Sequence, residues 1–383
     1  MENHTTHTTY GTAIHHLVSH CGSLAASERC LLVVDATTSD LADSFRLTAA
    51  QIGASFDLIE IDVADRHGKE PTADAASRMG QADLVLGLTK MSLAHTRARQ
   101  ALCANGGRYL SLPGYSRELL ADPCVQTDFQ GQYALTRAIS DAFSAGSEVR
   151  VKTAAGTDVW LGIAGRTGNC CPGFVNQHYS LGSPPDIESN VSPVEHLSEG
   201  IAVIDGSVAC DEIGLLEEPI ELTISGGRIT GVRSARSDYV ERVNVLFARI
   251  GYPKALVLAE CGVGLNPLAK LTGNMLTDEG CLGCVHFGFG SNITVGGQND
   301  VPFHIDFVMR DASLWIDGNM VLDGGRPCIL CYGDGGNCRY PKQSPHETLP
   351  IASRRHRPTA GLEHATALPR QASTETTRNR NKT

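Results

Sequence analysis

The sequence has few aromatic residues and no long apolar segment. Phe, Trp and Tyr make up 5% of its 383 residues, whereas Gly occurs 40 times, which is typical of a β-rich chain with many turns. No run approaches the roughly 18–20 apolar residues of a membrane-spanning helix, so we expect no membrane partner. The first 30 residues are polar and His-rich rather than a secretory signal. With 13 Cys, an odd number, we expect reduced thiols and a cytoplasmic location.

Positive charge is also scarce outside the C-terminus. The net charge is −10, yet residues 351–383 contain seven basic and two acidic residues. The rest of the chain is therefore more acidic than the total suggests. Because binding to a phosphate backbone needs clustered Lys and Arg, we expect no nucleic-acid partner.

The N-terminal half alternates between strand and helix patterns. Short apolar runs at 31–35, 57–62, 82–89 and 108–112 predict strands, and apolar spacing at 39–53, 92–104 and 128–143 predicts helices. This alternation predicts an α/β domain at 1–147, with a polar N-terminal lead-in and a parallel sheet covered by helices. The turn at 35–40 contains no Gly, so neither the G-x-G-x-x-G fingerprint nor a P-loop is present and we do not expect nucleotide binding.

The second half has a different texture. Residues 149–152 and 159–163, and again 220–224 and 228–232, flank Gly-containing turns and predict β-hairpins. We therefore expect a β-rich catalytic metal-binding domain at 148–345. Residues 346–383 are rich in Arg, Thr and Pro without periodicity and predict a disordered basic tail.

Four polar side chains interrupt apolar or Gly-rich segments of this domain. Glu260 ends an apolar run, His286 lies in a Gly-rich stretch, and His304 and Asp306 form an H-x-D pair whose members share one face of a strand. Each has an ordinary alternative. Glu260 could pair with Lys270 or cap a turn, His286 could be a hydrogen-bonded core histidine, and His304 and Asp306 could simply bond to each other. Together, imidazoles and carboxylates form a ligand set for a divalent ion, and a metal would offset the cost of burying Glu260.

These segments resemble a known family. The stretch Glu260-Cys-Gly-Val-Gly-Leu-Asn-Pro-Leu-Ala269, the segment from Asp278 through His286 to Asn292, and His304-Ile-Asp306 are similar to the aminopeptidase T family of metallopeptidases. The resemblance is specific over 255–325 and implies that Glu260, His286, His304 and Asp306 bind a pair of divalent metals. It maps a further ligand onto Glu188, with Glu195 as the second choice and a solvated loop carboxylate as the alternative. The Tyr that follows the matching His in that family is missing from 291–295.

A sister branch, iron-dependent dioxygenases that open dihydroxypyridine rings, is similar in the same segment. That resemblance implies a shared H-x-D pair, but with a His at the position of Glu260 and no counterpart of His286. Such a site has two His and one carboxylate. Because this chain has Glu260 and His286, the comparison favours the hydrolase type.

The leading prediction is therefore a metallohydrolase of an amide or peptide-like bond, acting on a small molecule or short peptide-like substrate. One or two divalent ions (Zn, Co or Mn) would activate water, with Glu188 or Glu260 as general base. The alternatives are a ring-cleaving Fe(II) dioxygenase on the same scaffold and a catalytically inactive metal-binding protein. We also expect a homodimer.

The cysteines permit one further interpretation. Cys281-x-x-Cys284 and Cys328-x-x-Cys331, with Cys338 as an extra ligand, have the internal spacing of zinc-binding pairs. The two pairs lie much farther apart than the roughly 15–20 residues of a zinc ribbon, and the family frame makes the first pair ordinary strand residues. We therefore expect no zinc there, and we expect Cys170 and Cys171 to be buried or loop thiols. The isolated His95, His178 and His196 are expected to be surface or core residues rather than ligands.

Overall fold

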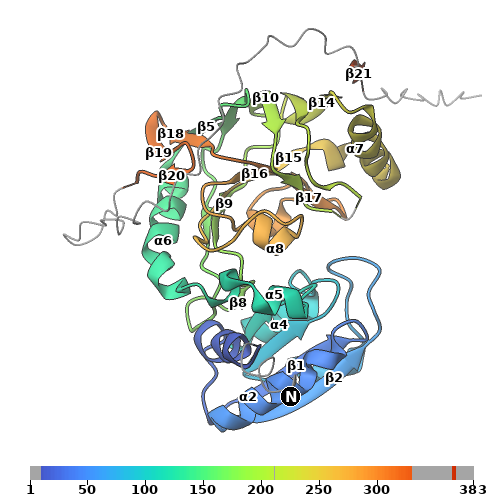
Figure 1. Ribbon diagram of the computed structural model, residues 1–383, viewed down its shortest axis with the longest axis vertical. Helices are drawn as coiled ribbons and strands as arrows, with labels where there is room; N and C mark the ends of the chain where they lie inside the picture. Colours follow the sequence, from blue (N-terminus) through green and yellow to red (C-terminus); the bar gives the residue numbers. More distant parts are fainter. Residues whose placement is uncertain (1–9, 211, 330–364, 368–383) are drawn as a thin grey trace, which may run out of the picture.

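The computed structural model describes residues 10–210, 212–329 and 365–367 (Figure 1). Its N-terminal part is a five-stranded parallel sheet in the order β2-β1-β3-β4-β8. The strands are β1 (Arg29–Asp35), β2 (Ser55–Ile61), β3 (Leu84–Leu88), β4 (Arg108–Ser111) and β8 (Leu181–Gly182). The helices are η1 (His16–Cys21), η2 (Ser39–Leu41), α2 (Ala42–Ile52), α3 (Ala73–Met79), α4 (Arg97–Ala104), α5 (Arg117–Ala121), η3 (Pro123–Gln126) and α6 (Phe129–Ala145). The predicted α/β architecture is confirmed.

Two antiparallel sheets form the C-terminal part, in agreement with the predicted β-rich half. The nine-stranded sheet has the order β20-β19-β18-β5-β6-β10-β13-β14-β21. Its strands are β5 (Glu148–Lys152), β6 (Asp158–Gly162), β10 (Ser198–Ile204), β13 (Ile220–Ser225), β14 (Arg228–Ser234), β18 (Ser313–Ile316), β19 (Asn319–Asp323), β20 (Arg326–Pro327) and β21 (Ala365–Ala367). Of the tail expected at 346–383, only β21 lies within the described residues, and it pairs with β14.

The seven-stranded sheet has the order β12-β11-β17-β16-β15-β9-β7. Its strands are β7 (Gly168–Cys171), β9 (Glu188–Val191), β11 (Ser207–Val208), β12 (Gly214–Leu215), β15 (Leu258–Gly264), β16 (Val285–Gly290) and β17 (His304–Met309). The remaining helices of this part are α7 (Ser237–Ile250), η4 (Pro253–Leu256), α8 (Met275–Asp278) and η5 (Ile293–Val295).

One face of β16 and β17 is aromatic and packs under α7. The Phe247 ring of α7 is stacked 6.4 Å from Phe307, which meets Phe289 edge-on at 5.4 Å. Phe303, just before β17, lies 5.6 Å from Phe247. Because side chains alternate across a strand, this packing leaves the opposite face of β17 to His304 and Asp306, as the sequence predicted.

The chain passes directly from the parallel sheet into the seven-stranded sheet. Five residues separate the end of β8 from Glu188, the first residue of β9. The Tyr115 hydroxyl, after β4, donates to the Pro184 carbonyl at 2.8 Å, and Asn266 Nδ2 donates to the carbonyls of Cys124 and Pro185. The carboxyl edge of the parallel sheet therefore faces the start of β9. Within the described part of the chain, no helix has the length and apolar character to cross a membrane.

Candidate metal centre

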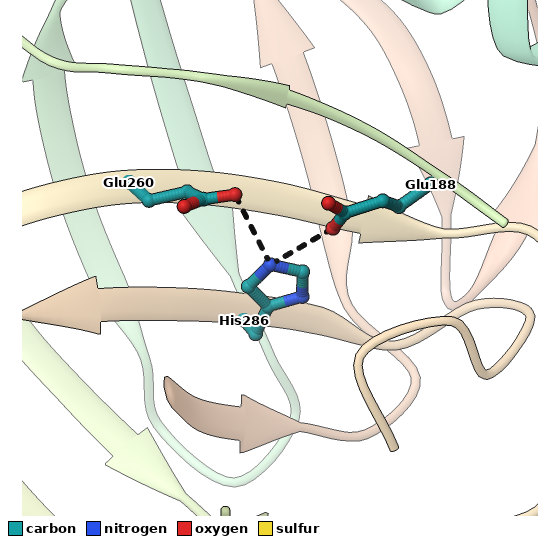
Figure 2. A group of neighbouring side chains, drawn as sticks. All are labelled: Glu188, Glu260 and His286. Carbon is teal, nitrogen blue, oxygen red and sulfur yellow. Dashed lines mark ion pairs between the residues drawn. The ribbon is translucent and has the colours of Figure 1, made fainter. Parts of the chain in front are cut away.

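Five predicted ligands meet on one face of the seven-stranded sheet. They are Glu188 on β9, Glu260 on β15, His286 on β16, and His304 and Asp306 on β17. Figure 2 shows the His286 ring between the carboxylates of Glu188 and Glu260. Its Nε2 lies 3.1 Å from Glu188 Oε2 and 3.7 Å from Glu260 Oε1. The structure thus brings together residues that lie up to 118 positions apart in the sequence.

Glu260 connects two halves of this cluster. Its Oε2 lies 3.4 Å from His304 Nε2, which lies 3.2 Å from Asp306 Oδ1. One group of potential ligands is Glu188, Glu260 and His286, and the other is Glu260, His304 and Asp306, each with its ligand atoms within 4.8 Å of one another. In the described residues Glu260 pairs with the imidazoles of His286 and His304, and not with Lys270 as the alternative interpretation of the sequence had it.

Two glycines make room for these side chains. A Cβ atom at Gly262 would lie 2.0 Å from His286 Nε2, and one at Gly288 would lie 2.6 Å from His304 Nε2. Gly262 is the register partner of His286, and Gly288 that of both Glu260 and Asp306. Any larger residue would occupy the space between the ligands, so these positions require Gly for spatial reasons.

Four of the five predicted ligands are buried, His304 is open to solvent, and the protonation equilibria of the cluster are strongly shifted. The exposed fraction is 1% for His286 and 4–7% for Glu188, Glu260 and Asp306, while the His304 side chain is 32% exposed. Burial opposes a charged imidazole, but the carboxylates paired with His286 and His304 raise the pKa of both rings well above its usual value. Burial likewise opposes ionisation of Asp306, but the His304 charge lowers its pKa below the usual range.

Two further carboxylates adjoin the site and were not assigned from the sequence. Asp186 is 7% exposed, and among the described residues neither its Oδ1 nor Glu279 Oε1 has a hydrogen-bond partner. Burial raises the pKa of both groups well above the usual value, and the charges of Glu188 beside Asp186 and of Asp306 beside Glu279 add to the effect. Asp186 lies two residues before Glu188, and Glu279 directly follows α8. The sequence did not predict that either is buried, because a single polar residue in a loop is usually exposed.

The residues present fit a divalent cation. Five carboxylates surround two imidazoles, and within the described residues His286 Nδ1, like Asp186 Oδ1 and Glu279 Oε1, has no hydrogen-bond partner. Buried charge is costly unless it is paired or coordinates a metal. A dication between the glycine-lined ligands would offset the excess negative charge, and mixed nitrogen and oxygen donors suit Fe, Zn, Co or Mn.

Glu195, the second choice for the mapped ligand, has a different role. Its carboxylate accepts hydrogen bonds from Asn292 Nδ2 at 2.9 Å and from the Gln298 backbone at 2.7 Å, and pairs with Arg166. Glu195 therefore stabilises the loop after β16 that contains Asn292 and Gln298, and it belongs to neither ligand group. His178 and His196 are exposed and also lie outside both groups.

His95 is the residue whose position the sequence did not indicate. It follows β3 at the carboxyl edge of the parallel sheet, where ligands bind in open α/β folds. Desolvation and, to a smaller extent, the His304 charge lower its pKa to about 4, against the opposing effect of Glu260. His95 is thus a neutral imidazole at neutral pH within electrostatic range of the cluster, and it is exposed to solvent.

Fold and site together define a two-part metalloenzyme, in which an α/β half faces a cluster of candidate metal ligands on a β-rich half. The sequence profile of the NicX family, described as 2,5-dihydroxypyridine 5,6-dioxygenase, matches residues 15–328, and the chain belongs to this family. A curated 2,5-dihydroxypyridine 5,6-dioxygenase from Pseudomonas putida KT2440 is 28% identical over 144 residues, which cover 35% of this chain and 40% of that protein. The alignment thus spans less than half of the relative.

Two solved structures share the fold. The 2,5-dihydroxypyridine dioxygenase of Pseudomonas putida KT2440 has a TM-score of 0.72 at 18% identity, covering 84% of this chain and 97% of that one. AmpT from Thermus thermophilus has a TM-score of 0.58 at 15% identity, covering 84% and 99%. The fold is therefore similar to both branches expected from the sequence. The family that is shown is NicX and not aminopeptidase T. The descriptions of the family and of the curated relative support the dioxygenase alternative better than the hydrolase.

Proposed function

We propose that this protein is an Fe(II)-dependent dioxygenase that opens the ring of a small hydroxylated N-heterocycle. The observation that carries the proposal is the family match over 15–328, which includes both the metal cluster and the facing parallel sheet. The sequence-based preference for hydrolysis is accordingly replaced by its alternative.

Each part of the site has a role in this chemistry. Glu260, His304 and Asp306 would hold the iron, with His286 as an additional imidazole beside Glu260. When bound, ferrous iron supplies the redox chemistry that ring cleavage by dioxygen requires. His95 is neutral at neutral pH and would accept a hydrogen bond from a ring hydroxyl, orienting the substrate beside the cluster.

One observation favours a second candidate, a metal-dependent hydrolase of an amide bond. The cluster contains Glu188 and His286 in addition to the Glu260 group, and Glu260 is common to both halves. A carboxylate shared by two ligand groups suits two ions that together activate water. The dioxygenase pattern described from the sequence has no use for this additional pair.

Metal reconstitution separates the two functions. Metal-free protein would be loaded under nitrogen with Fe(II), Zn²⁺, Co²⁺ or Mn²⁺ and assayed with 2,5-dihydroxypyridine in an oxygen electrode, and with an aminoacyl amide under nitrogen. We expect Fe(II) alone to support oxygen uptake with loss of the pyridine absorbance, and no ion to support amide cleavage. The His196→Ala variant, in which an exposed histidine outside both ligand groups is removed, is the control and should respond to each ion as the unsubstituted protein does. Amide turnover under nitrogen with Zn²⁺ or Co²⁺, without oxygen uptake with Fe(II), would establish the hydrolase instead.

A further inference from the structure

Cys281 and Cys284 occupy the two ends of a tight turn that leads into β16. The Cys284 backbone N–H donates to the Cys281 carbonyl at 3.0 Å. Gly283, the third residue of the turn, has φ +85°, the left-handed conformation that a type II turn requires at this position. A Cβ atom there would also lie 2.4 Å from the Gly325 carbonyl oxygen. The turn is therefore sterically fixed.

This geometry places the two cysteines close enough to form a disulfide. The first and fourth Cα atoms of a β-turn lie within about 7 Å of each other, and disulfides form between Cα atoms about 4.4–6.8 Å apart. Among the described residues both cysteines are free, and Cys281 Sγ donates to the Ala269 carbonyl at 3.3 Å. Cys281 is partly accessible, whereas Cys284 is 5% exposed. An external reagent would thus reach Cys281 first.

Cys281 differs in accessibility from several other cysteines of the described chain. The thiols of Cys21, Cys124 and Cys261 are buried, whereas that of Cys281 is partly accessible. A partly accessible thiol beside a buried partner is the arrangement of an attacking and a resolving cysteine.

We propose that Cys281 and Cys284 form a reversible dithiol–disulfide modification site for small-molecule disulfides. The Cys281 thiolate attacks one sulfur of the external disulfide, forming a mixed disulfide and releasing one thiol. Cys284 then loses its proton and attacks Cys281 Sγ, which releases the second thiol. In total the protein loses two protons and two electrons, one external disulfide is reduced to two thiols, and one internal disulfide forms.

The turn is linked to the metal centre by the backbone. Gly283 N–H donates to the Gly264 carbonyl at 3.2 Å, and Gly264 N–H donates to the Cys284 carbonyl at 3.0 Å, at the end of β15. Glu279 lies two residues before the turn and His286 two residues after it. A disulfide here would cross-link the segment between Glu279, which adjoins Asp306, and the predicted ligand His286. Oxidation of the two thiols is therefore placed to affect the metal site.

The test uses the full-length protein loaded with Fe(II) under nitrogen and oxidised glutathione as the probe. After exposure, free thiols are alkylated and peptides are mapped by mass spectrometry. We expect Cys281 and Cys284 to be recovered as one internal disulfide, reversed by dithiothreitol. Cys281→Ser should prevent the reaction, and Cys284→Ser should stop it at glutathione attached to Cys281. Cys284→Ala serves if the Ser variant does not fold, and the exposed Cys328→Ser is the matched control.

Three results would overturn the proposal. One is the absence of any Cys281–Cys284 disulfide in the wild-type protein. Another is oxidation confined to other cysteines, such as Cys170 and Cys171. The third is a zinc ion that stays bound in the Asp306→Ala variant and protects both thiols, since that would make the pair part of a structural zinc site.

Discussion

Glu188 Oε2 lies 3.1 Å from His286 Nε2 although their strands are not neighbours in the sheet. Strand β15 runs between β9 and β16, and the His286 ring reaches across it over Gly262. The absence of a side chain at Gly262 is therefore what joins the Glu188 half of the cluster to the rest.

Substitution of Gly262 by Ala should separate these two side chains. The new Cβ atom would lie 2.0 Å from His286 Nε2, and overpacking of this kind costs about 1–3 kcal/mol. We expect a lower free energy of unfolding in urea and less bound metal per chain by elemental analysis. Gly231→Ala is the matched control, because its Cβ would meet nothing closer than 3.4 Å. Equal effects of the two substitutions would contradict the role of Gly262.

Ligand substitutions should affect metal content unequally. His304→Ala and Asp306→Ala remove one ligand group and should abolish activity and most metal binding without unfolding the parallel sheet. His286→Ala disturbs the Glu188 group and, in a mononuclear iron enzyme, should reduce iron content less. Elemental analysis and circular dichroism check both statements. Full metal content in both the His304 and Asp306 variants would show that the metal lies elsewhere.

Metal removal should make stability fall as pH rises. The pKa values of Asp186, Glu279, His286 and His304 are all raised in the folded metal-free protein, so the native state binds more protons than the unfolded chain. The stability these groups contribute is present at low pH and is lost as pH rises through their folded pKa values. We expect the melting temperature with chelator to drop from about pH 6 to about pH 9. The metal-loaded protein should not share this decline, because its ligands are already deprotonated. A metal-free protein that becomes more stable over this range would refute the charge balance described for the cluster.

His95 should titrate far below an ordinary histidine. Its pKa is lowered to about 4, so its contribution to stability is present above about pH 6.5 and is lost as pH falls toward 4. The ring protons, followed by NMR in the metal-free protein, should show this low midpoint. His95→Asn should raise KM for 2,5-dihydroxypyridine by about tenfold, the loss of one hydrogen bond, with metal content unchanged. The exposed His178→Ala should have no effect, and a normal midpoint for His95 would remove the basis for its role.

The sequence predicted those parts of the site that break a local pattern. Glu260, His286, His304 and Asp306 were found because each interrupts an apolar or Gly-rich strand, and the alternation of β17 placed two of them on one face. Asp186, Glu279 and His95 were missed because their proximity to the cluster arises only from tertiary packing, and for His95 from the other half of the molecule. The type of reaction was not predicted correctly either, since Glu260 and His286 favoured the hydrolase branch whereas the family match supports the dioxygenase branch, which was ranked second.

The short passage from β8 to β9 has a consequence for how this fold can be altered. Glu188 follows the last strand of the parallel sheet by only five intervening residues, and Tyr115 holds that passage at the Pro184 carbonyl. The two halves are therefore not interchangeable modules. A chimera that replaced the N-terminal sheet, or a linker inserted at 183–187, would displace a member of the cluster even if both halves folded normally.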